Sequence, residues 1–324
     1  MSPTNTRERF ELITMGRVGV DVYPEQVGVR LEDVRSFGKF LGGSSTNVAV
    51  AATRLGHRSA TITRTGDDPF GRYIHAALQG FGVDDRFVCA VDGLPTPVVF
   101  CEIFPPDDFP LYFYREPKAP DLEIRPDELD LDAIRDADVF WFTVTGLSQE
   151  PSRAAHLAAL EARAGRGTTI IDLDYREMFW DTQGSAAEQI AAVLPFVDVA
   201  VGNREECRVA VGEDDPDAAA KALRDAGVSL AVVKQGPAGV LGSRSRVGAD
   251  EHVVVPPVPV EVVNGLGAGD AFGGALVHGL LENWDLETAL SFANAAGAHV
   301  AGQLACADAM PTIQQVESMM GDVR

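Results

Sequence analysis

VNGLGAGDAF, residues 263–272, is the stretch that decides the fold prediction. Residues 258–263 predict a strand that leads into it, and apolar residues at helical spacing predict a helix over 271–281. The glycines between them allow a sharp turn and leave main-chain N–H groups uncovered. The first N–H groups of a helix have no partner within the helix, so such a turn binds phosphate well. The order strand, glycine turn, helix therefore predicts an anion site.

Asp270 follows the last glycine and lies in or beside the first helical turn. An aspartate at this place commonly caps a helix, and residue type alone supports that interpretation as well as a catalytic one. A carboxylate beside an anion site repels phosphate, so it should have another role. The obvious role is to accept a proton from a substrate hydroxyl that attacks the phosphate.

The composition bounds the class of protein and its partners. The chain has 324 residues, 46% of them hydrophobic, which is enough for a sizeable core. There are 27 Lys and Arg against 48 Asp and Glu, a net charge of -21, which argues against binding to nucleic acid or to an anionic membrane. No apolar run approaches membrane-spanning length, and the N-terminus has no signal-peptide core. We expect a cytoplasmic protein with a disordered tail over 1–9 and one domain over 10–324.

Strands and helices alternate in the second half of the chain. Nearly continuous apolar strands are predicted at 138–144, 168–173, 197–201 and 230–233, with helices at 152–164 and 291–300. Such strands are typical of a parallel sheet covered on both faces. The alternation implies right-handed crossovers and a doubly wound α/β sheet, with ligands at the carboxyl ends of the strands.

Two earlier segments, about 17–41 and 96–118, predict a second, small sheet. Strands at 98–104 and 111–114 flank a proline-rich turn, and Arg115 and Lys118 follow the aromatic second strand. This hairpin is placed to help enclose the site, and two basic residues there suit a substrate carboxylate. An exposed hairpin with ordinary basic residues, or a dimer contact, is the alternative interpretation.

Gly-Ala-Gly-Asp at 267–270, after a strand and before a helix, resembles the signature of the ribokinase-like (PfkB-type) carbohydrate kinases. Other runs are similar to that family in its own order. They are the glycines and aspartate of 16–21, the Gly-Gly and Asn of 42–47, and the runs 66–71, 203–206 and 234–239. The resemblance implies a doubly wound, mostly parallel sheet with helices on both faces and a small β-sheet lid.

The resemblance also implies roles for the matching residues. Asp270 would be the catalytic base, and the amides of Gly267, Ala268 and Gly269 would form the anion hole. The residues expected to bind substrate are Arg17, Asp21, Gly42, Gly43, Asn47, Arg115, Lys118 and Arg176. Those expected to bind nucleotide are Asn203, Glu206, Lys234, Gly236, Gly239, Gly267 and Asn294, with Glu206 also reaching the metal through water. The alternatives are a capped helix at Asn203 and a surface ion pair of Arg176 with Asp174 or Glu177.

Within the family, the likeness is fullest to kinases that use ATP and Mg²⁺ to phosphorylate the 6-hydroxyl of a six-carbon keto acid. Residues 16–24, 37–43 and 100–122 carry that likeness. Many relatives have Asp where Asn264 stands, and in potassium-activated relatives that Asp belongs to the cation site. The neutral Asn264 therefore argues against activation of this chain by a monovalent cation, and it leaves the anion hole and the base intact. A homodimer formed through the lid is the partner that the resemblance suggests.

Rival functions stay open at this point. Within the family, the substrate is alternatively 2-keto-3-deoxygluconate or fructose. The glycine turns would also serve a dinucleotide-dependent oxidoreductase, although residues 16–21 lack the Gly-x-Gly-x-x-Gly fingerprint. A non-catalytic sugar sensor on the same fold is a further possibility, against which the presence of Asp270 speaks.

Overall fold

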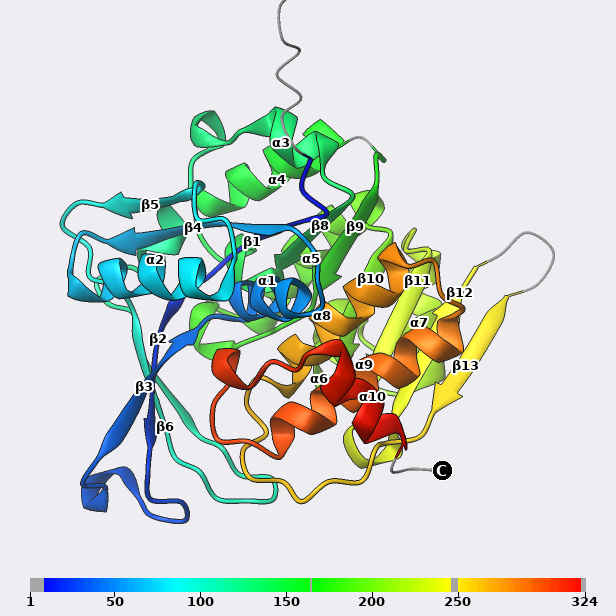
Figure 1. The fold of residues 1–324 in the computed structure, drawn as a ribbon. Coiled ribbons are helices and arrows are strands. Elements are labelled where there is room, and N and C mark those ends of the chain that lie inside the picture. Colours follow the sequence, from blue (N-terminus) through cyan, green and yellow to red (C-terminus); the bar gives the residue numbers. More distant parts are fainter. Residues whose placement is uncertain (1–8, 164, 246–249, 322–324) are drawn as a thin grey trace, which may run out of the picture.

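A twisted nine-stranded sheet forms the centre of the molecule in the computed structural model, which describes residues 9–163, 165–245 and 250–321. Its strand order is β13-β12-β11-β10-β9-β8-β1-β4-β5 (Figure 1). Every neighbouring pair from β5 to β11 is parallel, while β12 and β13 are antiparallel additions at one edge. This confirms the predicted α/β class and the mostly parallel sheet.

The strands and helices have the following bounds. The strands of the large sheet are β1 (Leu12–Met15), β4 (Ser59–Gly66), β5 (Val88–Val91), β8 (Val139–Thr143), β9 (Thr168–Asp172), β10 (Val199–Asn203), β11 (Leu230–Lys234), β12 (Val240–Arg244) and β13 (Glu251–Val255). The helices are α1 (Ser44–Arg54), α2 (Pro69–Phe81), α3 (Leu131–Asp136), α4 (Ser152–Arg163), α5 (Gln183–Val193), α6 (Arg204–Val211), α7 (Pro216–Asp225), α8 (Ala268–Leu281), α9 (Leu286–Ala301) and α10 (Ile313–Gly321).

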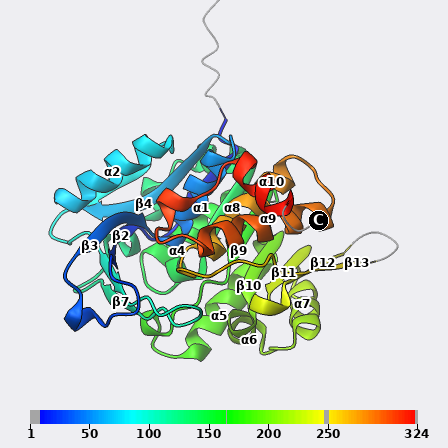
Figure 2. The same cartoon turned by 60° about the horizontal axis from the view of Figure 1, so that its bottom comes forward.

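The two faces of the sheet bury two separate apolar cores. Successive side chains of a strand point to opposite faces, so Trp141 lies in one core and its neighbours Phe140 and Phe142 in the other. Helices α1, α2, α8, α9 and α10 cover the first face, and α3 to α7 cover the second (Figure 2). Both layers bury apolar strand residues, which explains why the strands are apolar throughout.

The strand order reverses between β1 and β8. From β1 the chain proceeds outward through β4 and β5, and it then returns to β8 on the other side of β1 and proceeds toward β11. In open sheets of this kind, ligands bind outside the carboxyl ends of the strands at such a switch point. The topology therefore predicts where the site lies before any side chain is considered.

A separate four-stranded sheet stands at the carboxyl ends of these strands. Its order is β3 (Phe37–Gly42), β2 (Gly19–Pro24), β6 (Val98–Cys101) and β7 (Leu111–Tyr114), and it extends away from the large sheet at the lower left of Figure 1. Its strands come from the two segments in which the sequence predicts a small sheet.

Residues 258–263 form no strand, so that prediction is wrong. The strand β13 ends at Val255, and the chain then crosses to α8 as an irregular connector that contains Pro256, Pro257 and Pro259. Proline has no N–H to donate to a neighbouring strand. The connector is held instead at its end, where the amides of Val263 and Asn264 donate to the carbonyl of Ala301. No helix within the described ranges is long and apolar enough to cross a membrane.

Candidate active site

A cavity of about 440 Å³ lies at the predicted switch point, between the small sheet and the first turn of α8. It collects side chains from residue 17 to residue 306. Twelve of the predicted site residues line it, namely Arg17, Asp21, Gly43, Asn47, Arg176, Asn203, Glu206, Lys234, Gly236, Gly267, Gly269 and Asp270. The fold thus brings the two substrate motifs, the strand-end residues and the glycine turn to one place.

The glycine turn begins α8 as the sequence predicts. Gly267 is the N-cap residue, and its φ of 82° lies in the left-handed region that favours glycine. A Cβ at this position would lie 2.8 Å from the Sγ of Cys306, so the site also excludes a side chain sterically. The main-chain N–H groups of the first turn, which include those of Gly269 and Asp270, have no partner within the helix. The turn can therefore hold an anion at its positive end.

Asp270 does not cap its own helix. Its carboxylate instead accepts two hydrogen bonds from the start of α1, one from Ser44 Oγ at 2.8 Å and one from Asn47 Nδ2 at 2.8 Å. Burial raises the pKa of Asp270, and these two hydrogen bonds partly offset that shift. The capping interpretation is therefore wrong, and the carboxylate is held in a fixed orientation at the cavity. Ser44 is a site residue that the sequence analysis missed.

Two glycines make room at the start of α1. Gly43 caps this helix with a φ of 108°, and a Cβ on it would lie 2.4 Å from the carbonyl oxygen of Arg17. A Cβ on Gly42 would lie 2.1 Å from Asp21 Oδ1, so Gly42 leaves the space that the Asp21 carboxylate fills. Gly42 itself lies outside the cavity, and its role is to admit Asp21.

Asp21 is nearly buried, at 8% exposure, and faces the cavity from β2. The hydroxyl of Tyr23 donates to Asp21 Oδ2 at 2.7 Å, and the same hydroxyl lies 2.7 Å from Cys306 Sγ. Burial raises the pKa of Asp21 to about 6, against the lowering effects of the Tyr23 hydrogen bond and of Arg17. A buried acceptor of this kind suits hydroxyl groups of a sugar.

Two arginines share one carboxylate on the wall of the cavity. Asp174 forms ion pairs with Arg17 Nη2 at 3.2 Å and with Arg176 Nη2 at 2.7 Å. Burial alone would raise the pKa of Asp174, but these two guanidinium groups outweigh burial and lower that pKa to about 2. The Nε atoms of both arginines are buried without a hydrogen-bond partner among the described residues. The pair therefore keeps positive charge and donor capacity beside the cavity.

Arg115 and Lys118 lie outside the cavity, against the prediction that they bind a substrate carboxylate. Arg115 forms a buried ion pair with Asp121 at 2.8 Å. Lys118 donates to Glu123 Oε1 at 2.5 Å and to the carbonyl of Glu150 at 2.8 Å. Both cations are already paired with acidic or carbonyl oxygens of this chain, so they hold the segment after β7 in place. Of the basic residues expected to bind substrate, Arg17 and Arg176 remain at the cavity.

Asn203 and Glu206 combine the two interpretations that the sequence left open. Asn203 Oδ1 accepts from the amide of Glu206 at 2.9 Å, and Glu206 Oε2 accepts from the amide of Asn203 at 2.7 Å. This is a capping box at the start of α6. Both residues nevertheless line the cavity, and Glu206 Oε1 lies 4.0 Å from Arg176 Nη1. Capping fixes the Glu206 carboxylate at the wall of the site.

Lys234 ends β11 beside the anion turn. A Cβ on Gly269 would lie 3.3 Å from Lys234 Nζ, so the ammonium group is in contact range of the first turn of α8. Although burial lowers it, the pKa of Lys234 is raised overall by Asp172, Glu206, Asp270 and Asp174. Burial raises the pKa of Asp172 to about 7, against the effect of Lys234. A charged lysine at a helix N-terminus is suited to phosphate oxygens.

Three other predicted residues lie outside the cavity. Gly239 has a φ of 89° and packs against the carbonyl of Val255, so it serves the β12–β13 hairpin. Asn294 donates to the carbonyl of Pro256 at 2.7 Å and holds the connector. Ala268 belongs to the first turn of α8, where its amide donates weakly to Gly265 at 3.4 Å. Asn264 is fully buried and braces the same turn, since it donates to the Leu304 carbonyl and accepts from the Leu266 amide.

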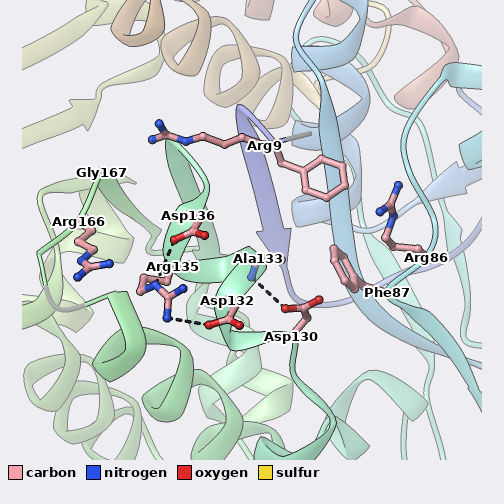
Figure 3. A pocket seen from close by; sticks show the side chains of 11 residues that line it. Arg9, Arg86, Phe87, Asp130, Asp132, Ala133, Arg135, Asp136, Arg166 and Gly167 are labelled. Carbon is pink, nitrogen blue, oxygen red and sulfur yellow. Dashed lines mark hydrogen bonds and ion pairs between the residues drawn. The ribbon is translucent and has the colours of Figure 1, made fainter. Parts of the chain in front are cut away.

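A larger cavity, of about 520 Å³, lies at the amino-terminal ends of the strands, opposite the first cavity (Figure 3). Its lining comes from residues that precede strands, such as Phe10, Phe87 and Gly167. Its charged groups are largely paired with one another or with the backbone, because Arg135 contacts Asp132 and Asp136, and Asp130 accepts from the amide of Ala133. It contains none of the motif residues, so size alone does not identify the active site.

Comparisons with known proteins agree with this geometry. The model of the pfkB family carbohydrate kinases matches residues 10–313. Two proteins named 5-dehydro-2-deoxygluconokinase are each 31% identical to this chain. The one from Clostridium perfringens is matched over 97% of this chain and 94% of its own length, and the one from Geobacillus kaustophilus over 98% and 96%. The structure of aminoimidazole riboside kinase from Salmonella enterica, complexed with aminoimidazole riboside and an ATP analog, is 27% identical. It superposes with a TM-score of 0.79 over 95% of this chain and 99% of that one.

The match to the family model covers almost the whole domain, and the fold is the ribokinase-like arrangement that the sequence predicts. The alternative of a dinucleotide-dependent oxidoreductase is therefore wrong. Taken with the cavity at the strand ends and the glycine turn that opens α8, these findings show that the chain belongs to the pfkB family of carbohydrate kinases.

Proposed function

We propose that this kinase transfers the γ-phosphoryl group of ATP to the 6-hydroxyl of 5-dehydro-2-deoxy-D-gluconate. The observation that carries the proposal is the Asp270 carboxylate, held by Ser44 and Asn47 beside the open amides of α8. The names of the relatives that are 31% identical over nearly their full length support this substrate. The ATP analog bound to the relative from Salmonella enterica supports the phosphoryl donor.

The proton transfer is assigned to Asp270. As the substrate hydroxyl oxygen forms its bond to the γ-phosphorus, the bond from phosphorus to the β,γ-bridging oxygen breaks, and the hydroxyl proton passes to Asp270. Burial raises the pKa of this carboxyl and makes it a stronger base than an exposed aspartate. The alcohol is a weak acid, so most of the rate enhancement comes from alignment and charge stabilisation.

The developing negative charge is stabilised by groups of this chain at the start of α8. The amides of Gly267 and Gly269 and the ammonium group of Lys234, all at the cavity, are assigned to the γ-phosphoryl group, while the Ala268 amide, which the sequence also predicted there, donates to Gly265 instead. Gly236, Asn203 and Glu206 line the same side of the cavity. Mg²⁺ bound to the phosphates would neutralise part of their charge, and Glu206 is placed to hold it through water. A buried carboxylate with Oε1 outside the capping hydrogen bond fits that role.

The substrate carboxylate is assigned to Arg17 and Arg176. Both line the cavity, and two guanidinium groups against the single Asp174 carboxylate leave net positive charge there. Asp21 and Asn47 also line the cavity and are assigned to the sugar hydroxyls, while Gly42 and Gly43 allow the close approach of the backbone. This arrangement selects an acid over a neutral sugar, because a buried guanidinium binds a carboxylate by charge-assisted hydrogen bonds.

The small sheet is assigned two further roles. Val99, Leu111 and Phe113 line the cavity from it, so it acts as a lid over the substrate. Phe37, Phe100 and Tyr114 form a row of edge-to-face aromatic contacts across three of its strands, and Phe37 and Tyr114 are exposed. An exposed aromatic face of this kind marks an interaction surface, and a second copy of the chain is the proposed partner.

Two remaining assignments concern cations and location. Asn264 is neutral and uses its amide to brace the turn before α8, so we propose an enzyme that needs no monovalent cation. We also propose a cytoplasmic location, which the net charge of -21 supports because it disfavours binding to anionic membranes.

The decisive experiment for the substrate is a panel of acceptors with MgATP. 5-Dehydro-2-deoxy-D-gluconate, 2-keto-3-deoxygluconate and fructose are compared at equal concentration by coupled ADP detection. The proposal expects the highest kcat/KM for the first. A higher kcat/KM for either of the others would replace this substrate and leave the kinase assignment standing.

A further inference from the structure

Two histidines and a glutamate meet at the end of α8 that is remote from the cavity. His57 Nε2 lies 2.7 Å from His278 Nδ1, and the ligand atoms of His57, His278 and Glu282 all lie within 4.8 Å of one another. Both histidines are buried, at 6% and 5% exposure, while Glu282 is exposed. We propose that these three residues bind a first-row divalent cation of the zinc type. We call the three residues the α8-end cluster.

The first support is the chemistry of the ligands. Two imidazole nitrogens and a carboxylate oxygen are the donor set that Zn²⁺ and its neighbours prefer over Mg²⁺ or Ca²⁺. Three protein ligands with water in the fourth position make a tetrahedral site that stays open on one side. The exposed Glu282 provides that open side, since solvent reaches its carboxylate.

The second support is a carboxylate that orients one of the ligands. Glu11 Oε1 lies 2.9 Å from His57 Nδ1, and Glu11 Oε2 accepts from the amide of Arg58 at 2.8 Å. A carboxylate only accepts hydrogen bonds, so His57 Nδ1 carries a proton and Nε2 presents a lone pair in the neutral ring. Metal-binding histidines are usually fixed in this way by an outer carboxylate.

The third support is that binding needs only a small adjustment. In a tetrahedral zinc site, two ligand nitrogens are separated by about 3.3 Å, so His57 and His278 need to separate by a few tenths of an ångström. Glu282 follows the last residue of α8, and its exposed side chain is free to rotate inward. The cation then replaces the proton that His278 Nδ1 donates to His57 Nε2; that proton leaves to solvent while His278 Nε2 takes one up, so both rings stay neutral.

The position of the cluster gives it a structural role. Helices α1 and α8 lie side by side (Figure 1) and are joined at one end by Asp270 with Ser44 and Asn47. His57 follows α1 and His278 lies near the end of α8, so the cluster joins the same two segments about 12 Å further along α8. A bound cation would link α8 to the segment after α1 at the end of these helices that is remote from Asp270.

The test uses the full-length protein after EDTA treatment and dialysis, with excess Mg²⁺ present to occupy the carboxylates of the active site. Calorimetry with Zn²⁺ measures stoichiometry and affinity. Co²⁺ reports coordination by its visible absorption, and it also quenches Trp284, whose ring centroid lies 5.0 Å from that of His278. The proposal expects one equivalent of Zn²⁺, intense tetrahedral Co²⁺ bands, and quenching that is lost in Trp284→Phe.

Variants assign the binding to these residues. His278→Gln is expected to abolish the binding, and Glu282→Gln to weaken it at least about tenfold. Glu11→Gln is expected to weaken it about tenfold, which is the usual effect of an outer ligand. Glu287→Gln, an exposed carboxylate on α9, is the matched control and is expected to bind as the unaltered protein does. Because Glu282 is exposed, its variant decides the matter even if His278→Gln fails to fold. Zn²⁺ binding that is absent in the unaltered protein, or unchanged in Glu282→Gln, would overturn the proposal.

Discussion

Arg17 is one of two predicted substrate-binding basic residues that line the cavity. It lies inside the cavity, paired with Asp174 and unpartnered at Nε, whereas Arg115 and Lys118 are paired elsewhere. We predict that Arg17→Met raises KM for the keto acid by roughly 10–100-fold and leaves KM for ATP within about twofold, since a hydrogen bond to a charged group contributes about 1.5–3 kcal/mol.

The control for this variant is Lys118→Met, which removes a basic residue outside the cavity and is expected to keep the selection for an acid. Initial rates with the keto acid and with a neutral sugar are compared for each variant. A loss in Arg17→Met that is equal for both substrates would show that Arg17 does not bind the carboxylate.

The pH dependence follows from the buried carboxyl of Asp21. Its pKa is raised to about 6, and only the ionised form accepts hydrogen bonds from both sugar hydroxyls. We therefore predict that kcat/KM falls as the pH drops through about 6. The hydroxyl of Tyr23 stabilises the ionised form, so Tyr23→Phe should move this acidic limb upward by roughly one pH unit.

Burial also raises the pKa of Asp270, and the response to Tyr23→Phe identifies which of the two carboxyls controls the acidic limb. Tyr73→Phe is the control, because the hydroxyl of Tyr73 contacts the Lys39 carbonyl and not Asp21. A pH profile of kcat/KM that is the same in Tyr23→Phe and in the unaltered protein would assign the limb to another group.

The residues that the sequence could identify are those whose spacing belongs to a local turn. Gly267, Gly269 and Asp270 lie within four positions of one another, and the structure places all three at the cavity. Residues that act through distant partners were missed, because no local pattern shows that Ser44 donates to Asp270. The wrong expectation for Arg115 has the same origin, since its burial beside Asp121 is a property of the folded segment.

At the scale of single elements, the start of α8 is the most constrained part of the site. We predict that Gly267→Ala lowers the free energy of unfolding by about 1–2 kcal/mol, because the left-handed backbone and the contact with Cys306 both oppose a side chain. We also expect kcat to fall by more than the loss of stability explains, because the amides that bind phosphate shift with the turn.

Gly80→Ala is the matched control for this prediction. Gly80 lies in α2, and nothing is within 4 Å of the place where its Cβ would be. We expect the free energy of unfolding of that variant to rise by about 0.5–1 kcal/mol, because alanine is a better helix former than glycine. Thermal unfolding and kcat are measured for both variants. A Gly267→Ala protein that unfolds and turns over like the unaltered one would contradict the strained-turn argument.

The helices and buried strands could be predicted because their apolar periodicity is strong, but the edge of the sheet could not. The strand assigned to 258–263 alternates in the same way as a true strand, yet Pro259 within it has no N–H for a ladder hydrogen bond, and Pro256 and Pro257 precede it. The β12–β13 hairpin contains the residues that pair, from Val240 with Val255 to Arg244 with Glu251.

At the scale of the whole molecule, the exposed face of the small sheet predicts a dimer. Tyr114 is 66% exposed, although its ring packs on Phe100. We predict a dimer in sedimentation velocity at micromolar concentration, and a monomer for Tyr114→Asp, because a buried unpaired charge is costly in an interface. Val254→Asp, at an exposed residue of β13 in the large sheet, is the control. A monomeric unaltered protein would contradict this use of the small sheet.

The overall architecture could be predicted from topology rules, since alternating elements leave few arrangements of a parallel sheet. The same rules place the ligand at the switch point between β1 and β8. The relation between the two sheets could not be predicted in this way, because it depends on contacts between segments as distant as Tyr23 and Cys306.

The measurement that tests the account most directly is kcat of Asp270→Asn with 5-dehydro-2-deoxy-D-gluconate at saturating MgATP, together with the nucleotide Kd. Asparagine keeps the size of the side chain and can still accept one of the two hydrogen bonds from Ser44 and Asn47, but it has no charge and cannot take the proton. The account predicts that kcat falls by roughly 10²–10⁴-fold while the nucleotide Kd stays within about threefold. A kcat close to that of the unaltered enzyme would contradict the claim that Asp270 is the base.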